Sequence, residues 1–281
     1  MPELPEVETI VRRYRRRLEG RRIVGFTSRW PRNVTPGLRL VRQAVEGRRI
    51  ARVWRRGKYI VFDLCDASGG VASGGGLVGH LLIHLRMSGR FEWASDQRRE
   101  PEHVRAHFDL DDRSRLLFCD ARKFGRISYA ADLAAATAGL GVEPLAPGFT
   151  TAVLGRLLRG RRRRLKPLLL DQSVIAGLGN IYADEALHAA GLHPLRRCDR
   201  LTADDVRRLR SAIRRVLQKA LRYRGTSFDR MYLGGRMQRH LRVYGRAGKP
   251  CGRCGTGIRR LRVGQRGTHF CPRCQPLEGG R

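Results

Sequence analysis

The chain begins Met1-Pro2-Glu3, and this terminus carries the residues best suited to covalent chemistry. Methionine before a small residue such as proline is normally removed, which would leave the secondary amine of Pro2 free. An α-amino group has a reference pKa of about 7.7–8.0, so a useful fraction is nucleophilic near neutral pH. The Glu3 carboxylate is a candidate partner for proton transfer. The terminus therefore predicts an amine nucleophile beside an acid/base group.

The same residues also have a purely structural interpretation. Pro5 suits the first turn of a helix, and Glu3, Glu6 and Glu8 would complement the positive end of the helix dipole. The choice between a nucleophile and an ordinary helix start depends on the other motifs of the chain.

Four cysteines near the C-terminus have the spacing of a metal site. Cys251 and Cys254 form one pair and Cys271 and Cys274 the other, in the pattern C-x2-C-x16-C-x2-C. Each pair presents two thiolates, and four thiolates complete the tetrahedral coordination of one Zn²⁺. Because no coordination position stays open, the sequence predicts one structural zinc ion.

The segment between the cysteine pairs predicts a hairpin tip at 263–268 that displays Arg266. The planar guanidinium of an arginine at such a tip can bind a phosphate. A solvated arginine is the alternative in so basic a chain.

Two glycines precede a predicted helix in Gly177-Leu178-Gly179-Asn180. They allow a ligand to approach the backbone closely, and the N–H groups of a helix start attract phosphate. Asn180 either caps this helix or reaches outward with its amide. The pattern predicts a helix–turn–helix joint and leaves its contact with DNA open.

Two predicted strands end in turns that carry large side chains. The first turn, in His84-to-Gly89, offers Met87, and the second, in Asp120-to-Gly125, offers Arg122 and Phe124. Exposed Met and Phe can wedge into a base stack while Arg fills the space that a displaced base leaves. The alternative is that Met87 and Phe124 are core residues at strand ends.

The composition favours a polyanionic partner. The 281 residues contain 58 Lys+Arg against 25 Asp+Glu, a formal net charge of +33. A charge excess of this size favours nucleic acid, although a GC-rich genome also enriches arginine. Lys58, at the predicted start of a strand, is by default one more solvated cation.

The sequence predicts a cytoplasmic protein without a membrane partner. It shows neither a secretory leader nor an apolar run of the ~18 residues that a membrane span needs. Three further cysteines, Cys65, Cys119 and Cys198, are scattered along the chain, which suits a reducing compartment better than a disulfide framework.

The hydrophobic pattern changes from β to α along the chain. A helix with one apolar face is predicted over 5–19. After it, short apolar runs predict strands over 22–26, 50–54, 59–64, 81–85, 107–110, 116–119 and 127–129. Beyond a linker rich in Pro and Gly, helices are predicted over 150–159, 164–172, 180–190 and 202–223, and a hairpin over 243–274. The Gly-rich stretch 68–76 predicts a hairpin insertion without a role in chemistry.

In this order, the motifs resemble those of the formamidopyrimidine-DNA glycosylase (Fpg) family over essentially the whole chain to Cys274. The matching segments are Pro2-to-Glu8, Arg56-to-Tyr59, His84-to-Gly89, Asp120-to-Gly125, Gly179-to-Tyr182 and the four-cysteine finger with Gln265-Arg266. The resemblance implies an α+β fold. Its parts would be an N-terminal catalytic β-sandwich flanked by helices (1–140), a linker (141–149), a helix–two-turn–helix DNA-binding domain (150–240) and a zinc-finger hairpin (241–281), with DNA in the cleft between the two halves.

The resemblance also implies base-excision repair by an enzyme that is both a DNA glycosylase and an abasic-site lyase. Pro2 would attack C1′ of the damaged nucleotide, expel the oxidised purine and form a Schiff base, after which β- and δ-elimination cut the strand on both sides. Glu3 would be the acid/base partner, and Glu6 would support the first helical turn beside the reacting sugar.

Other matched positions imply contacts with DNA. Those that would hold phosphates around the flipped nucleotide are Lys58, which also belongs to the catalytic set, Asn180, Arg266 and His84. Those that match the intercalating residues are Met87, Arg122 and Phe124, and Lys166 matches a lysine implicated in handling oxidised guanine. The implied partner is double-stranded DNA with oxidised bases or abasic sites, bound by a monomer in the bacterial cytoplasm, at the nucleoid.

The segment 228–242 is shorter than this resemblance leads us to expect. In the family it includes the loop that folds over an everted oxidised purine, so the preference for 8-oxoguanine stays open, whereas the Pro2 chemistry does not depend on it. One alternative is an enzyme like endonuclease VIII, which removes oxidised pyrimidines. Another is a protein that binds damaged DNA without cutting it, which would require a blocked or misplaced Pro2.

Overall fold

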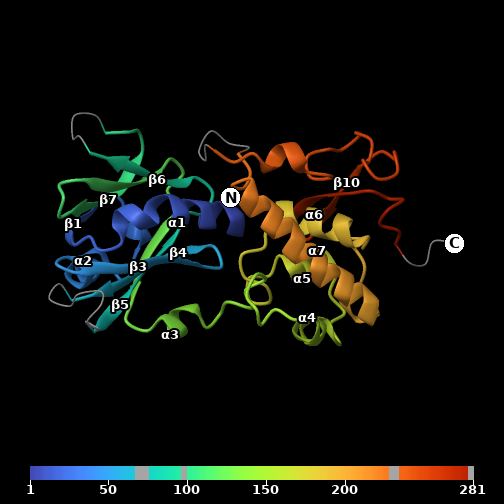
Figure 1. The fold of residues 1–281 in the computed structure, drawn as a ribbon, viewed down its shortest axis with the longest axis horizontal. Helices are drawn as coiled ribbons and strands as arrows, with labels where there is room; N and C mark the ends of the chain where they lie inside the picture. The colour runs from blue at the N-terminus through green and yellow to red at the C-terminus, as the bar shows by residue number, and fades with distance from the viewer. Residues whose placement is uncertain (67–75, 96–99, 228–233, 278–281) are drawn as a thin grey trace. The chain divides into compact units, whose positions relative to one another are not determined.

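The computed structural model describes residues 1–66, 76–95, 100–227 and 234–277, which divide into two compact units (Figure 1). Unit 1 contains the described residues from Met1 to Ala138, and unit 2 contains those from Gly139 onward. The glycine-rich insertion expected at 68–76 lies outside the described residues except for Gly76. The first six residues of the shortened segment 228–242 lie outside them as well.

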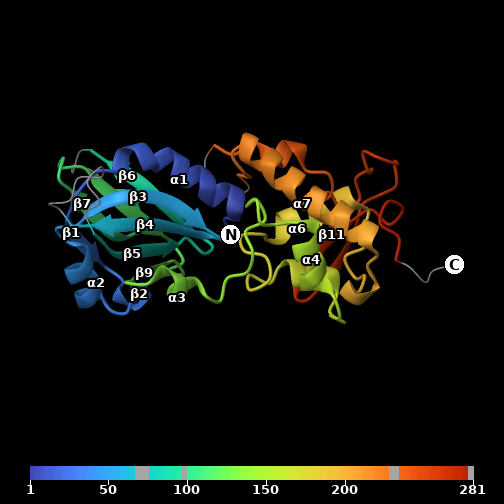
Figure 2. The same cartoon turned by 60° about the horizontal axis from the view of Figure 1, so that its bottom comes forward.

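Unit 1 is a sandwich of two sheets, as Figure 2 shows. The larger sheet has the order β2 (Val34–Thr35), β9 (Arg126–Ala130), β5 (Leu77–His84), β4 (Tyr59–Cys65) and β3 (Arg49–Arg56). The smaller has the order β1 (Ile23–Ser28), β7 (Val104–Leu110), β8 (Arg115–Asp120) and β6 (Gly89–Ala94). Neighbouring strands are antiparallel except β2 and β9. Phe62 of the larger sheet meets Phe108 and Phe91 of the smaller in a shared core.

Helix α1 (Leu4–Leu18) packs against β3 and β4 with the apolar stripe that the sequence predicts. Its buried face includes Val7, Ile10, Val11, Tyr14 and Leu18, and its other face carries arginines. Unit 1 also contains α2 (Leu38–Val45), α3 (Leu133–Thr137) and the short 3-10 helix η1 (Pro31–Asn33).

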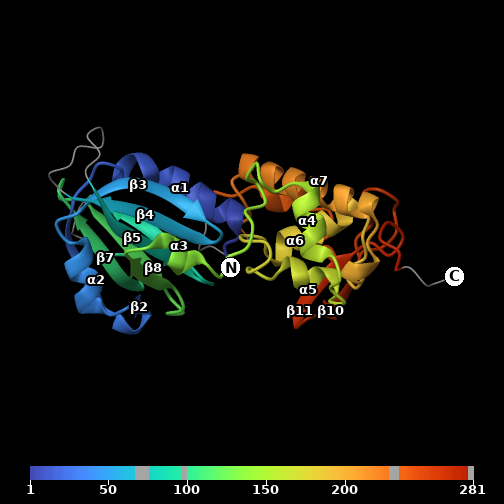
Figure 3. The same cartoon turned by 90° about the horizontal axis from the view of Figure 1, so that it is seen from below.

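Unit 2 is helical up to its C-terminal hairpin (Figure 3). Its helices are α4 (Thr151–Leu158), α5 (Leu165–Leu169), α6 (Asn180–Ala190) and α7 (Ala203–Arg222), with η2 (Cys198–Arg200) and η3 (Met237–His240) as 3-10 turns. The hairpin pairs β10 (Arg259–Val263) with β11 (Arg266–Phe270). Thr202 is the N-cap of helix α7 and forms a capping box with Asp205. The predicted α+β class and the hairpin are confirmed.

Several elements differ from the sequence-based expectation. Strand β6 and helix α2 were not predicted, and α5 ends at Leu169 instead of continuing to 172. The helix stops there because the Asp171 carboxylate accepts the N–H and hydroxyl of Ser173 and closes a local turn. The expected linker begins inside unit 2, since the Gly141 N–H donates to the Gln172 carbonyl oxygen at 2.8 Å.

Within these described ranges, no helix has the length and apolar character required to cross a bilayer.

Candidate functional site

Strand register collects the predicted turn residues of unit 1 at one end of the sandwich. Tyr59, which follows Lys58, pairs with His84, and His84 pairs on its other side with Arg126. In the smaller sheet, Gly89 pairs with Asp120. The turns 57–58, 85–88 and 121–125 therefore share one end of unit 1. The start of α1 lies at the same end in both views (Figures 1 and 2).

The N-terminus combines an accessible proline with two buried carboxylates. Met1 is 42% exposed and Pro2 is half-buried, whereas the side chains of Glu3 and Glu6 are buried. The Glu3 N–H donates to Glu6 Oε2 at 2.9 Å, and the Glu3 carboxylate accepts the Glu6 N–H in return. This capping box starts α1, and it fixes the backbone directly after Pro2. The structural interpretation of the terminus is thus correct, and it is compatible with the chemical one.

Lys58 and His84 occupy neighbouring strand ends and are both buried, in contrast to the solvated default for Lys58. His84 Nδ1 accepts the Arg86 N–H at 3.0 Å, and its ring meets Tyr59 edge-on. Burial, together with the charges of Arg86 and Lys58, lowers the pKa of His84 to about 3. The imidazole is therefore neutral near pH 7. Because Nδ1 accepts, the proton is assigned to Nε2, which can donate to a phosphate oxygen.

The side chains expected to intercalate project from unit 1. Met87 is 38% exposed and Phe124 is 49% exposed, so the alternative that they are core residues at strand ends is wrong. The exposed Arg122 lies with its guanidinium carbon 4.8 Å from the centre of the Phe124 ring. The two turns thus present the apolar side chains of Met87 and Phe124, and the cation of Arg122, to solvent.

In unit 2, Asn180 and the Arg266 hairpin come together. Asn180 is the first residue of α6, and Gly179 occupies the N-cap position. The Asn180 amide donates to the Gly267 carbonyl oxygen at 3.1 Å, directly after Arg266. Arg266 itself is exposed and pairs with Val263 across the hairpin turn. The predicted hairpin tip is confirmed.

Lys166, expected among the DNA contacts, is completely enclosed by protein. Its ammonium lies 2.6 Å from an Asp184 oxygen and donates to Thr268 Oγ1 at 2.8 Å and to the Gly267 carbonyl oxygen at 3.0 Å. Asp184 also accepts the His269 N–H at 2.8 Å. The ion pair therefore holds the hairpin that carries Arg266 against α6, which is a positioning role.

The four predicted cysteine ligands converge. Their sulfur atoms all lie within 4.8 Å of one another, and the Cys251–Cys274 and Cys254–Cys271 pairs are 3.9 and 3.4 Å apart. A tetrahedral Zn²⁺ with Zn–S bonds of ~2.3 Å requires S–S distances of about 3.8 Å, so the cluster fits this ion. Backbone N–H groups of Arg253 and Cys274 donate to Cys251 and Cys271 sulfur atoms, as in a closed structural site.

The acidic residues of α6 were missed as positioning residues. The Glu185 carboxylate accepts the N–H groups of Arg242, Val243 and Tyr244 at 2.8–3.0 Å and fastens the segment before the finger. Burial raises the pKa of Glu185, and these hydrogen bonds oppose the rise. The available signal was the pair Asp184-Glu185 in an otherwise apolar stretch of predicted helix.

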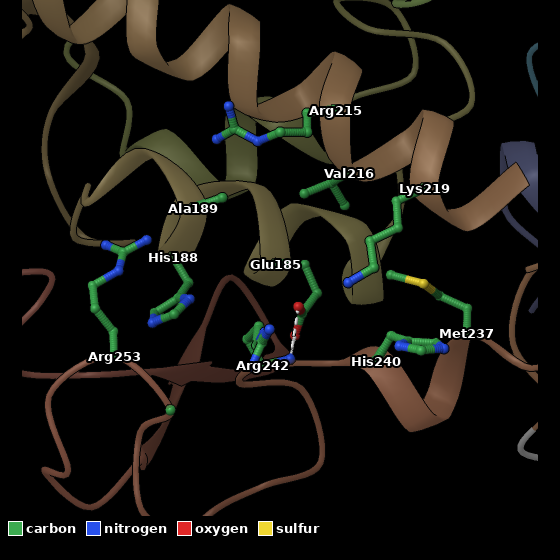
Figure 4. Close-up of a pocket in the computed structure, with 11 residues that line it drawn as sticks. Glu185, His188, Ala189, Arg215, Val216, Lys219, Met237, His240, Arg242 and Arg253 are labelled. Atoms are coloured by element: carbon green, nitrogen blue, oxygen red, sulfur yellow. Dashed lines mark hydrogen bonds between the residues drawn. The ribbon is translucent and has the colours of Figure 1, made fainter. Parts of the chain in front are cut away.

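Beside Glu185 lies a cavity of about 430 Å³ (Figure 4). Four cations contribute to its lining: Arg215 and Lys219 of α7, and Arg242 and Arg253. None of the lining residues belongs to the set that the sequence singled out for chemistry, so this cavity is separate from the candidate site.

Family models match three consecutive parts of the chain. They describe the formamidopyrimidine-DNA glycosylase N-terminal domain at residues 1–127, the formamidopyrimidine-DNA glycosylase H2TH domain at 140–231, and a zinc finger found in FPG and IleRS at 248–277. A formamidopyrimidine-DNA glycosylase from Chloroflexus aggregans is 46% identical and aligns over 99% of each chain. One from Symbiobacterium thermophilum is 43% identical over 100% of this chain and 91% of its own.

Comparison with solved structures leads to the same family. The structure of MutM in complex with carbocyclic 8-oxo-G containing DNA has a TM-score of 0.89 and 35% identity, and the match covers 98% of this chain and 100% of that one. Lactococcus lactis Fpg bound to AP-site DNA has a TM-score of 0.88 with 34% identity and the same coverage. Together, the fold, the helix–two-turn–helix unit and the zinc finger define the class of the protein, which is a DNA glycosylase that acts in DNA repair. The chain belongs to the formamidopyrimidine-DNA glycosylase family, and its finger holds one structural Zn²⁺.

Zinc removal should unfold the finger and leave unit 1 folded. Replacing Cys254 by Ser, or chelating the ion, removes a bond network that supplies the folding free energy of such small metal-bound hairpins. Zinc content and amide exchange of residues 248–277 and of unit 1 measure the effect. Cys65→Ser is the control and should keep one zinc per chain. A Cys254→Ser protein with full zinc and unchanged exchange would contradict the assignment.

Breaking the buried ion pair should destabilise unit 2. Lys166→Met leaves the Asp184 carboxylate buried without its cation, which costs about 3–5 kcal/mol in comparable proteins. The double variant Lys166→Met/Asp184→Asn should recover much of this loss, because the amide oxygen still accepts the His269 N–H. Urea unfolding provides the free energies, and Lys219→Met, at a cation in the last turn of α7, is the control. Equal stability of Lys166→Met and Lys219→Met would refute the positioning role.

Proposed function

We propose that the chain removes oxidised purines, formamidopyrimidines and 8-oxoguanine, from double-stranded DNA and then cuts the resulting abasic site. One observation carries the proposal: an accessible Pro2 stands directly before the capped, buried Glu3, at the end of the sandwich that also presents Met87 and Phe124. The relatives support it, since solved Fpg structures hold DNA with 8-oxo-G, Fapy-dG or an abasic site.

The proposed reaction uses the amine that is exposed once Met1 is removed. The nitrogen lone pair of Pro2 attacks C1′ while the bond from C1′ to the base breaks, and the base leaves with a proton. Ring opening then gives an iminium between Pro2 and C1′. The iminium withdraws electrons and acidifies the C2′ proton, so β-elimination expels the 3′ phosphate and δ-elimination the 5′ phosphate. Glu3 exchanges the protons that these steps need.

The remaining candidate residues make C1′ reachable. A stacked base shields C1′ from attack, and extrusion costs a few kcal/mol. Insertion of Met87 and Phe124, with Arg122 in the vacated position, offsets this cost. We assign the phosphates around the extruded nucleotide to Lys58, neutral His84, Asn180 and Arg266. The catalytic part is then 1–140, followed after 141–149 by a DNA-binding part at 150–240 and the finger at 241–281. The enzyme acts as a monomer on chromosomal DNA in the bacterial cytoplasm.

Borohydride should trap a covalent adduct between the protein and DNA with an abasic site or a purine lesion. Reduction converts the iminium into a stable amine, and peptide mass spectrometry should locate the DNA on Pro2. A chain that retains Met1 or carries an N-terminal tag should bind the same duplex without being trapped. Failure to trap any of these duplexes with a verified free Pro2 would refute the lyase assignment.

Purine lesions should be excised about tenfold faster or more than pyrimidine lesions, as expected when a pocket recognises the polar edge of the base. The excision rates are compared by single-turnover cleavage of duplexes that contain 8-oxoguanine opposite cytosine, formamidopyrimidine or thymine glycol. The reverse order would identify an enzyme like endonuclease VIII. Binding without cleavage of any duplex would identify a damage-binding protein.

A further inference from the structure

A buried carboxylate connects the two turns that carry the intercalating side chains. Asp120, the last residue of β8, has no exposed surface. Its Oδ1 accepts the Ser88 hydroxyl and, at 3.2 Å, the Arg122 N–H. Its Oδ2 accepts the Gly125 N–H at 2.7 Å. Among the described residues Asp120 forms no ion pair, so its charge is stabilised by these neutral donors.

These donors lie next to the side chains that would enter DNA. Ser88 directly follows Met87 in the sequence. Arg122 lies two residues before Phe124, and Gly125 directly follows it. The Ser88 hydroxyl, itself buried, also accepts the Arg122 N–H at 3.2 Å. One carboxylate and one hydroxyl thus link the backbone of the 121–125 turn to the 85–88 turn.

The two turns also close over one phenyl ring. A Cβ on Gly125 would lie 2.3 Å from Phe118 Cζ, and a Cβ on Gly89 would lie 2.5 Å from the Leu85 carbonyl oxygen and 3.0 Å from Phe118 Cζ. Glycine is therefore required at both positions for the turns to approach so closely. The exposed tips of both turns therefore lie above closely packed backbone and the Phe118 ring, which leave no room for a different turn conformation.

Each turn contains a residue in a backbone conformation that needs support. Arg86 has φ of +54° and Lys123 has φ of +58°, in the left-handed region that non-glycine residues seldom occupy. Such conformations persist where surrounding contacts determine them. The hydrogen bonds of Asp120 and Ser88 involve residues within two positions of Arg86 or Lys123.

We propose that Asp120 is a positioning residue that locks the Met87 turn and the Arg122–Phe124 turn into one rigid wedge. The proposal rests on the function proposed above. A wedge that is already ordered loses little conformational freedom on entering the base stack, so more of its contact energy is available for extruding the nucleotide. Asp120 itself contacts no DNA, because it is buried under both turns.

Asp120→Asn tests the proposal. An amide has one acceptor oxygen, so it cannot serve both the Gly125 N–H and the Ser88–Arg122 side. The probe is a duplex with a tetrahydrofuran abasic analogue and an adjacent 2-aminopurine, whose fluorescence rises when the wedge unstacks it. We expect the equilibrium constant for insertion to fall about tenfold, as loss of one charge-assisted hydrogen bond would give, with overall duplex affinity within about twofold. Excision of 8-oxoguanine should lose kcat with little change in KM.

Matched variants separate positioning from stability and charge. Leu116→Val perturbs the buried part of the same strand, and Asp109→Asn makes the same charge change at the ion pair with Arg115. Both should insert like the unmodified protein. Ser88→Ala, which removes one link, should lose less insertion than Asp120→Asn.

The outcomes distinguish this proposal from the function on which it rests. Normal insertion by Asp120→Asn, or an equal loss in Leu116→Val, would overturn the positioning role. Pro2→Gly in the tetrahydrofuran duplex should insert normally, because no bond to the sugar is needed. If the unmodified protein inserts but cannot be trapped on a natural abasic site, the lyase proposal fails and the positioning role stands. If it does not insert at all, both fail.

Discussion

Buried carboxylates that accept backbone N–H groups position the candidate segments of this chain. Glu3 and Glu6 cap each other at the start of α1, Asp120 joins two turns of unit 1, and in unit 2 Asp184 and Glu185 fasten the hairpin and the segment before the finger. A buried N–H without a partner is costly, and an ionised acceptor satisfies it about twice as strongly as a neutral one. Irregular segments gain from these contacts the rigidity that regular helices and strands obtain from their own ladders.

This arrangement separates the two signs of charge in a chain with a formal net charge of +33. The acids named above are buried, while cations such as Arg122 and Arg266 are exposed. Exposed arginines repel one another, and DNA phosphates relieve that repulsion as they release counterions. The buried acids do not take part in this exchange, because backbone donors and Lys166 already compensate them. Binding of DNA can therefore change the surface electrostatics without loosening the framework.

Local patterns were predictable, and long-range partners were not. The Cys251-to-Cys274 spacing, the stripe of α1 and the hairpin tip at Arg266 depend on residues close in sequence or on fixed ligand chemistry, and the structure has all three. Burial of Lys58 and Lys166 was not predictable, since it depends on neighbours far along the chain. The same holds for Asp120, which accepts from Ser88 across 32 positions. The sequence also left undecided whether Met87 and Phe124 are buried or exposed. A turn pattern does not determine whether the side chains at a strand end point to the core or to solvent.

The most consequential of these carboxylate contacts is the one nearest the chain start. Terminal residues usually fray, which would spread a nucleophile over many positions. Here the cap lies at Glu3 and α1 begins at Leu4, so the proposed nucleophile Pro2 directly precedes the cap. Since α1 is buried against β3 and β4, the nitrogen of Pro2 inherits the rigidity of the sandwich. Restricting a reactive group in this way converts an encounter into a nearly unimolecular step, which is among the largest single contributions to catalysis. In the proposed mechanism, the capping pair Glu3 and Glu6 thus has the structural role, and Glu3 has the proton-transfer role as well.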